Sequence, residues 1–221
     1  MKNYNLGFIK MKNIITILFI AMSFIGIAQN KAKDLLNEVS AKVKSYDNIS
    51  IEFKYVLENA SENIKQETRG DVVMQGEKYR LNILGITRLF NGKIMYSISP
   101  EDEEVTISSE SDNKEDSITP SKMLSFYENG YTYVMDIVQN VKGRKVQYVK
   151  LTPIDSNSEI KYILLGIDIQ TKHIYNLIQV GENETNTILT VNSFKTNEPI
   201  SKSLFTFNES KYNDYYINKL N

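Results

Sequence analysis

The sequence predicts a mostly β fold of the α+β class, in which an antiparallel sheet is accompanied by one long and one short helix. Three observations lead to this prediction. Apolar and polar residues alternate through most of the chain after residue 48, which is the period of a half-buried strand. Short polar turns separate these segments, as expected between antiparallel strands. Only residues 31–44 and 120–127 show the spacing of helices.

The N-terminus has the pattern of a cleaved secretory signal peptide. Lys12 precedes an apolar run over residues 14–28, which ends in Gly26-Ile27-Ala28, with small residues where a signal peptidase cleaves. A membrane-spanning helix would need about 20 apolar residues, more than this run supplies. We therefore expect residues 1–28 to be removed and the protein to be exported from the cytoplasm.

Cleavage after Ala28 would leave a single domain over residues 29–221. Gln29 is not a cysteine, so we expect no lipid on the new N-terminus. The net charge of −1 becomes more acidic on cleavage, because three lysines and no acid are lost; nucleic acid, which needs a basic patch, is therefore not an expected partner. The chain has no cysteine, so burial alone must hold the fold. Met11 is an alternative start.

The first half of the domain begins with the long helix, where Ala32, Leu35, Leu36, Val39 and Val43 form one apolar stripe. Period-two segments then predict strands at residues 49–58, 64–75, 79–83, 88–90, 94–99 and 104–109. The dipeptide Asn91-Gly92 is the strongest hairpin signal. A polar loop is expected over residues 109–117.

The second half begins with the short helix, which Thr119-Pro120 opens and Asn129-Gly130 ends. A meander of strands is then expected at residues 131–138, 145–153, 159–168, 173–180 and 184–196, followed by a last short strand at residues 204–207. The tail beyond residue 207 has no assigned element.

Motifs for catalysis or metal binding are lacking. His173, the only histidine, lies in a predicted hairpin turn, where an exposed side chain without a catalytic role is the simpler interpretation. One histidine without cysteine makes a poor zinc site. The acidic clusters at residues 101–104 and 112–116 do not have calcium-loop spacing and are typical of solvated turns. We expect a protein that is not an enzyme and needs no cofactor or metal; a hydrolase would require a titratable partner for His173.

The apolar side chains leave two alternatives, an ordinary filled core or a ligand cavity between the helices and the sheet. A filled core is the commoner outcome for an amphipathic helix over a sheet. The 14 tyrosines suit strands that lie half in water and half against a core or ligand. For the cavity, hydrophobicity predicts a lining of Leu35, Leu36, Val39, Val43, Phe53, Tyr55, Leu81, Ile83, Tyr96, Met123 and Phe126.

A set of short segments adds a resemblance to a known family. The segments are Gly70-Asp71-Val72-Val73-Met74, Lys78-Tyr79-Arg80-Leu81, Phe90-Asn91-Gly92-Lys93-Ile94-Met95-Tyr96, Glu104-Val105-Thr106-Ile107, Pro120-Ser121-Lys122-Met123-Leu124-Ser125-Phe126-Tyr127 and Leu204-Phe205-Thr206-Phe207. In kind and order they resemble the outer-membrane lipoprotein carrier family, LolA, in its Bacteroidetes form. The better-known members carry an Arg near the position of Gly76-Glu77; Arg80 is shifted from it, so the role of that Arg is not transferred.

The resemblance implies a periplasmic carrier. Such proteins have a strongly curved antiparallel sheet, an open half-barrel, with helices that cover the concave face as a lid. The cavity would hold the acyl chains of lipoproteins. The implied partners of this monomer are acylated lipoproteins, an inner-membrane ABC-type exporter, and an outer-membrane acceptor or the outer membrane itself. The second hypothesis is a periplasmic sensor of lipids or lipoproteins with the same fold, which would regulate a signalling partner.

Overall fold

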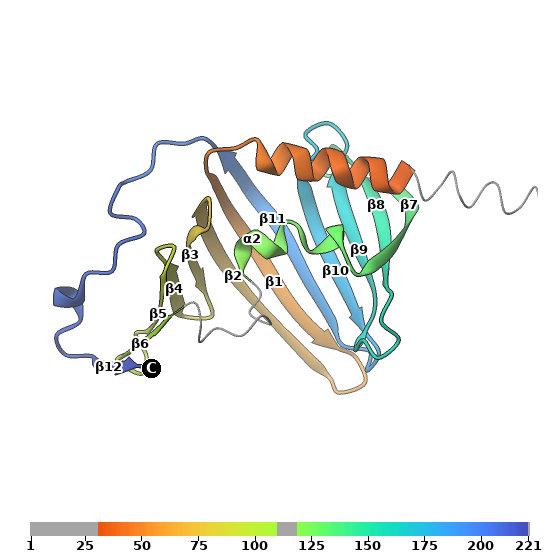
Figure 1. Ribbon diagram of the computed structural model, residues 1–221. Helices are drawn as coiled ribbons and strands as arrows, with labels where there is room; N and C mark the ends of the chain where they lie inside the picture. The colour runs from red at the N-terminus through yellow and green to blue at the C-terminus, as the bar shows by residue number, and fades with distance from the viewer. Residues whose placement is uncertain (1–30, 110–118, 221) are drawn as a thin grey trace, which may run out of the picture.

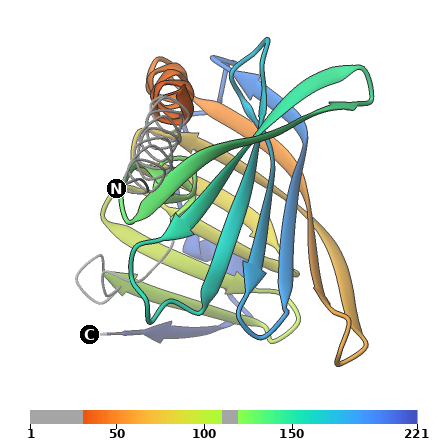
Figure 2. The same cartoon turned by 90° about the vertical axis from the view of Figure 1, so that its right-hand side faces the viewer.

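A computed structural model describes residues 31–109 and 119–220. The predicted signal peptide and residues 110–117 of the predicted polar loop lie outside the described residues. Twelve strands form one curved, unclosed sheet in the order β12-β6-β5-β4-β3-β2-β1-β11-β10-β9-β8-β7. Figure 2 shows how strongly the sheet curves, because β3–β6 run behind β8–β11 and nearly across their direction. The predicted mostly β half-barrel is confirmed.

Two antiparallel meanders make up the sheet apart from its last strand, β12. The first consists of β1 (Ile49–Asn59), β2 (Ile64–Gln75), β3 (Lys78–Ile83), β4 (Ile86–Phe90), β5 (Ile94–Ser99) and β6 (Glu104–Ser109). The second consists of β7 (Tyr131–Val141), β8 (Arg144–Pro153), β9 (Ile160–Asp168), β10 (Ile174–Gly181) and β11 (Asn186–Thr196). Antiparallel pairing of β1 with β11 joins them, so strands far apart in sequence meet at the centre of the sheet.

The long helix and the short helical segment after residue 119 lie on one side of this sheet (Figure 1). The long helix covers residues 31–44, and Figure 1 shows it crossing one end of β11 to β7. The segment with α2 (Pro120–Met123) and η1 (Phe126–Glu128) crosses the strands nearer their middle. A further short helix, η2 (Glu209–Tyr212), belongs to the C-terminal segment. Among the described residues, no helix is long and apolar enough to cross a membrane.

The main core lies between the long helix and the second meander. Ala32, Leu36 and Val39 are buried, as the apolar stripe predicted. They belong to one hydrophobic cluster with the alternate residues of β8 and β9, which are Val149, Leu151, Ile163, Leu165 and Ile167. The period of two in these strands therefore turns one set of side chains toward the helix.

The C-terminal segment differs from the prediction. Residues 204–207 form no strand; they lie beside the outer face of the first meander, where Phe205 is buried and Phe207 stacks on Tyr96 with 4.4 Å between ring centroids. The alternation of aromatic residues there reflects burial against a sheet face, not strand pairing. The last strand is instead β12 (Tyr216–Lys219), which pairs with β6 in parallel.

Candidate functional site

An apolar cavity of about 290 Å³ lies between the concave face of the sheet and the segment that contains α2. Its lining is entirely hydrophobic, and the hydroxyl of Tyr55 is the only polar side-chain group among fifteen residues. These residues are Ile51, Phe53, Tyr55, Val72, Met74, Leu81, Ile83, Pro120, Met123, Leu124, Ile174, Leu177, Leu189, Val191 and Phe194. A cavity almost without donors and acceptors suits a hydrocarbon ligand and disfavours a charged one.

The register between the central strands brings the residues that line the cavity onto one face of the sheet. On β1, Ile51 pairs with Val72 on one side and Phe194 on the other, so all three side chains share a face. Phe53 pairs with Gly70, and its ring lies so close to that glycine that an added Cβ would stand 2.6 Å from the ring atom Cζ. The ring therefore lies directly on the backbone of β2, which keeps this part of the concave face flat and apolar.

Residues 119–130, which we call the strap, cover the cavity. The Oγ1 of Thr119 accepts a hydrogen bond from the N–H of Lys122, which caps α2. From α2 and the residue after it, Pro120, Met123 and Leu124 face the cavity. Since this side of the strap is apolar, ordinary hydrophobic contact holds it against the sheet.

The other end of the strap is tied to the long helix. Tyr127 is 1% exposed. Next to it, Oε1 of Glu128 accepts hydrogen bonds from Nζ of Lys44 at 2.8 Å and from Oγ of Ser40 at 2.5 Å. The hydrogen bond from Lys44 has the larger effect and that from Ser40 the smaller, and both lower the pKa of the Glu128 carboxyl. The strap thus combines an apolar contact over the cavity with a charged contact at the protein surface.

His173 lies in the hairpin connection between β9 and β10, as the sequence predicted, but its side chain is not exposed. Its imidazole is half-buried, and Nε2 lies 2.8 Å from the hydroxyl of Tyr46, just beyond the long helix. It also stacks on Phe194, which lines the cavity. Burial lowers the pKa of His173, Lys42 lowers it further, and Asp168 opposes both. The physical reason for the difference is tertiary, because the partners of the histidine come from distant parts of the chain.

The predicted cavity residues divide into two groups. Phe53, Tyr55, Leu81, Ile83 and Met123 line the cavity together. The others do not line it: Leu35, Leu36 and Val39 are buried in the core, Val43 and Phe126 pack against that core, and Tyr96 lies on the opposite face against Phe207. The binding role of the lining residues is taken up below as a proposal.

Sequence reasoning missed ten of the lining residues. Ile51 belongs to the same alternation as Phe53 and Tyr55, so the period of β1 could have identified it. The contributions of β10 and β11, such as Leu177 and Leu189, depend on the pairing of the two meanders, which no local pattern specifies. On β5, the sequence predicted that Tyr96 faces the cavity side of the sheet. Met95, the residue before it, packs against the core instead, so the predicted orientation of β5 is wrong.

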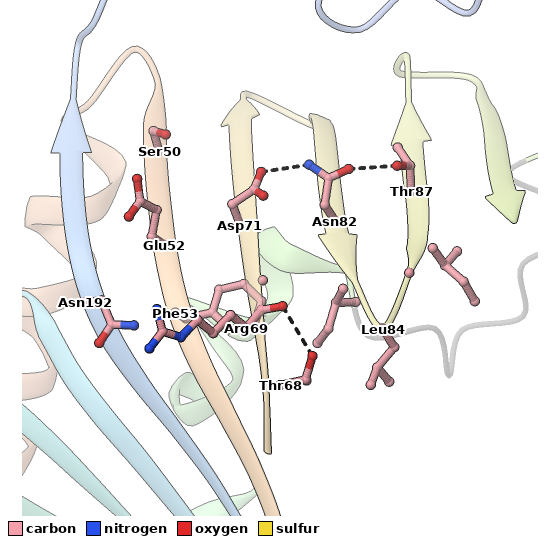
Figure 3. A pocket seen from close by; sticks show the side chains of 14 residues that line it. Ser50, Glu52, Phe53, Thr68, Arg69, Asp71, Asn82, Leu84, Thr87 and Asn192 are labelled. Atoms are coloured by element: carbon pink, nitrogen blue, oxygen red, sulfur yellow. Dashed lines mark hydrogen bonds between the residues drawn. The ribbon is translucent and has the colours of Figure 1, made fainter. Parts of the chain in front are cut away.

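A polar groove of about 740 Å³ lies beside the end of β3 (Figure 3). Asn82 donates a hydrogen bond from Nδ2 to Oδ2 of Asp71, and its Oδ1 accepts one from Oγ1 of Thr87, both at 2.8 Å. Phe53 and Ile83 line this groove as well as the apolar cavity. Across residues 31–109 and 119–220, no group of three or more His, Cys, Asp or Glu is arranged to hold a metal ion.

Comparison with known proteins gives structural likeness only. No protein-family model and no curated protein matches the sequence. The fold is similar to an uncharacterized conserved protein from Thermus thermophilus, with 10% identity, 86% of this chain and 99% of that chain covered, and a TM-score of 0.55. It is also similar to LprF from Mycobacterium bovis, with 12% identity, 78% and 95% covered, and a TM-score of 0.51.

A LolA superfamily protein from Nitrosomonas europaea is also similar, with 12% identity, 80% of this chain and 97% of that chain covered, and a TM-score of 0.41. The resemblance of the sequence segments to the LolA family, in its Bacteroidetes form, stays a prediction. At these identities the likeness concerns the fold. The fold and the site together define the class, a half-barrel protein with an apolar cavity under a strap.

Proposed function

We propose that this protein binds the acyl chains of lipoproteins in the apolar cavity and carries them through the periplasm from the inner to the outer membrane. The observation that carries the proposal is the cavity itself, whose fifteen lining residues offer a single hydroxyl group. Such a site has little to offer a polar substrate, whereas an alkyl chain gains from every methylene that leaves water.

The size of the cavity supports an affinity suited to transfer. A methylene group is about the size of a water molecule, whose share of liquid volume is about 30 Å³, so a cavity of about 290 Å³ accepts about ten such groups. At about 0.8 kcal/mol each, the gross gain is about 8 kcal/mol before the cost of ordering the ligand. This corresponds to micromolar binding at best, which permits release as well as capture.

Export to the periplasm is part of the same proposal. We propose that residues 1–28 are a signal peptide cleaved after Ala28, leaving one lipid-binding domain over residues 29–221. The partners would be an ABC-type exporter at the inner membrane and an acceptor at the outer membrane, or that membrane itself. Intact-mass measurement of the exported protein tests the cleavage, and a mass that retains residues 14–28 would contradict it.

Binding is tested by titrating the protein with a fluorescent palmitate analogue. Leu189→Glu places a carboxylate in the cavity, and we expect it to weaken binding at least about tenfold. Ile188→Glu is the matched control, because Ile188 is the neighbouring half-buried residue of β11 and does not line the cavity. Equal loss of binding in both variants, or in neither, would contradict a cavity site.

A transfer assay separates the carrier from the other hypotheses. Inner-membrane vesicles that hold a triacylated lipoprotein are mixed with the protein, and the soluble fraction is then added to outer-membrane vesicles. A carrier releases the lipoprotein into the soluble fraction and delivers it intact. Binding without delivery would favour the lipoprotein sensor. Release of free fatty acid would indicate a hydrolase.

A further inference from the structure

Strand β2 is paired along only half of one edge. On one side, all of Ile64–Gln75 pairs with β1. On the other side, β3 pairs only with residues 70–75, because β3 ends at Ile83 opposite Gly70. Among the described residues, no strand pairs with residues 64–69 on this side. An extended segment of six residues, about 20 Å long, therefore presents backbone donors and acceptors that could pair with another strand.

This free edge lies next to the polar groove. Thr68 and Arg69 from the free edge line the groove, together with Leu84 and Gly85 from the turn that ends β3. Figure 3 shows Thr68 and Arg69 on one side and Leu84 at the end of the neighbouring hairpin. The groove thus extends from the paired polar residues Glu52, Asp71 and Asn82 to the place where β3 stops and β2 continues.

The free edge and the groove also adjoin the apolar cavity, because Tyr55, which lines the cavity, pairs with Thr68 of the free edge. Phe53 and Ile83 line both spaces, and both residues pair with Gly70, on whose backbone the ring of Phe53 lies. A ligand whose hydrocarbon enters the cavity past Tyr55 and Ile83 would have its polar end beside the free edge. The polar end of an acylated protein is a peptide, and an extended peptide is what the edge of a strand recognises.

We infer that residues 64–69 of β2 form a second subsite, which binds the peptide following the acylated end of the ligand by adding it to the sheet as a strand. The peptide would occupy the place into which β3 would continue if it were longer. This inference rests on the proposed function, because it places the acyl chain in the cavity. The main-chain contacts are independent of sequence, so the subsite would accept many different lipoproteins provided that the segment is flexible and uncharged enough to extend.

The other long edge of the sheet is less suited to this role. β7 is one of the two terminal strands, and its exposed side chains include Val134, Ile137 and Val138. A bulge between Met135 and Val138 interrupts its register. Bulges of this kind hinder the addition of a strand. No residue of β7 lines the cavity or the groove, so this edge has no connection to the acyl chain.

The test uses palmitoylated hexapeptides of Ser, Thr and Gly, with the change made in the ligand so that folding of the protein is unaffected. One peptide is unmodified, one carries N-methyl groups on its odd-numbered backbone amides, and one carries them on its even-numbered amides. In a paired strand, alternate amides point to opposite edges. We expect one methylated peptide to bind about tenfold more weakly than the other, which corresponds to the loss of one or two net hydrogen bonds.

Hydrogen exchange locates the contact. The unmodified peptide should slow exchange of amides in residues 64–69, whereas palmitate alone should not, and the amides of β7 serve as the internal control. Equal affinities for the two methylated peptides, or protection on β7 in place of β2, overturn the inference while leaving the acyl site intact. Failure of palmitate and all three peptides to bind would overturn the proposed function and this inference together.

Discussion

The hydroxyl oxygen of Tyr46 and Nε2 of His173 lie 2.8 Å apart, although 127 residues separate them in the chain. The imidazole also stacks on Phe194, with 4.1 Å between ring centroids. The pair therefore connects the end of the long helix to the wall of the cavity. Burial lowers the pKa of His173 below its ordinary value of 6.5, so the folded state favours the neutral imidazole.

The sign of this shift predicts a loss of stability on acidification. A histidine whose pKa is lowered by folding contributes fully above its unfolded pKa, and the contribution decreases as the pH falls through about 6.5 and below. We expect the melting temperature to fall between about pH 7.5 and pH 5.5, and to fall less in His173→Gln. Tyr46→Phe, which keeps the histidine, should retain the dependence. Identical pH profiles for the wild type and His173→Gln would contradict this prediction.

The long helix should tolerate charge very differently on its two sides. Val39 is 0% exposed and belongs to the hydrophobic core. Val39→Glu would bury a carboxylate without a partner, and we expect it to lower the free energy of unfolding by about 3–5 kcal/mol. Asn37→Glu introduces the same charge at an exposed position of the same helix and should change stability by less than about 0.5 kcal/mol. Urea denaturation measures both.

A mild effect of Val39→Glu on stability, with a selective loss of palmitate binding, would mean that water and ligand reach the helix. The cavity would then extend beyond the fifteen residues that line it in this structure.

Gly70 should resist substitution because of close packing. A Cβ at this position would stand 2.6 Å from Cζ of Phe53 and 2.7 Å from the carbonyl oxygen of Asn82. We expect Gly70→Ala to destabilise the protein by about 1–3 kcal/mol, the usual cost of overpacking. In a Phe53→Leu background the ring is absent, so the penalty of Gly70→Ala should be smaller, with the contact to Asn82 remaining. Thermal unfolding of the wild type, the two single variants and the double variant measures the coupling between the two positions. Additive effects would show that the ring of Phe53 is not what makes Gly70 resist substitution.

The contact of Glu128 with Ser40 and Lys44 should control how fast a bound acyl chain leaves. Glu128→Gln removes the charge from this contact while the apolar part of the strap is kept, so we expect faster dissociation of fluorescent palmitate with little change in melting temperature. Glu38→Gln is the matched control, because Glu38 lies on the long helix with Ser40 and Lys44 but forms its ion pair with Lys172, at 2.6 Å, and not with the strap. Stopped-flow displacement measures both rates; equal rates in the two variants would count against a role of the strap contact.

The contact of Glu128 with Ser40 and Lys44 should depend on pH in a lower range than the histidine does. The pKa of Glu128 is lowered by folding, so its contribution is present above the unfolded pKa of 4.5 and is lost as the pH falls through the folded value. Ligand dissociation should therefore accelerate below about pH 4.5, separately from the histidine effect, and Glu128→Gln should remove this acceleration.

Much of the fold could be predicted because its elements depend on local pattern. The long helix follows from its apolar stripe, and the strand β2 matches the period-two segment over residues 64–75. The exceptions have a common cause. Aromatic alternation at residues 204–207 has the appearance of a strand, yet these residues are buried against a face of the sheet, and Tyr96 lies on the opposite face from the one that hydrophobicity indicated. Both faces of the first meander bury apolar side chains, so hydrophobicity does not distinguish inside from outside there.

The sequence by itself determined the class of fold and indicated five of the residues that line the cavity. Four of them follow from the alternation along β1 and β3, and Met123 follows from the helical spacing of residues 120–127. Only the tertiary structure decided where the cavity closes, since that depends on the pairing of β1 with β11 and on the strap. It also decided the environment of His173 and the free edge of β2. Register between distant strands and contacts between distant segments are set by the packing of the whole chain, and no short stretch of sequence contains them.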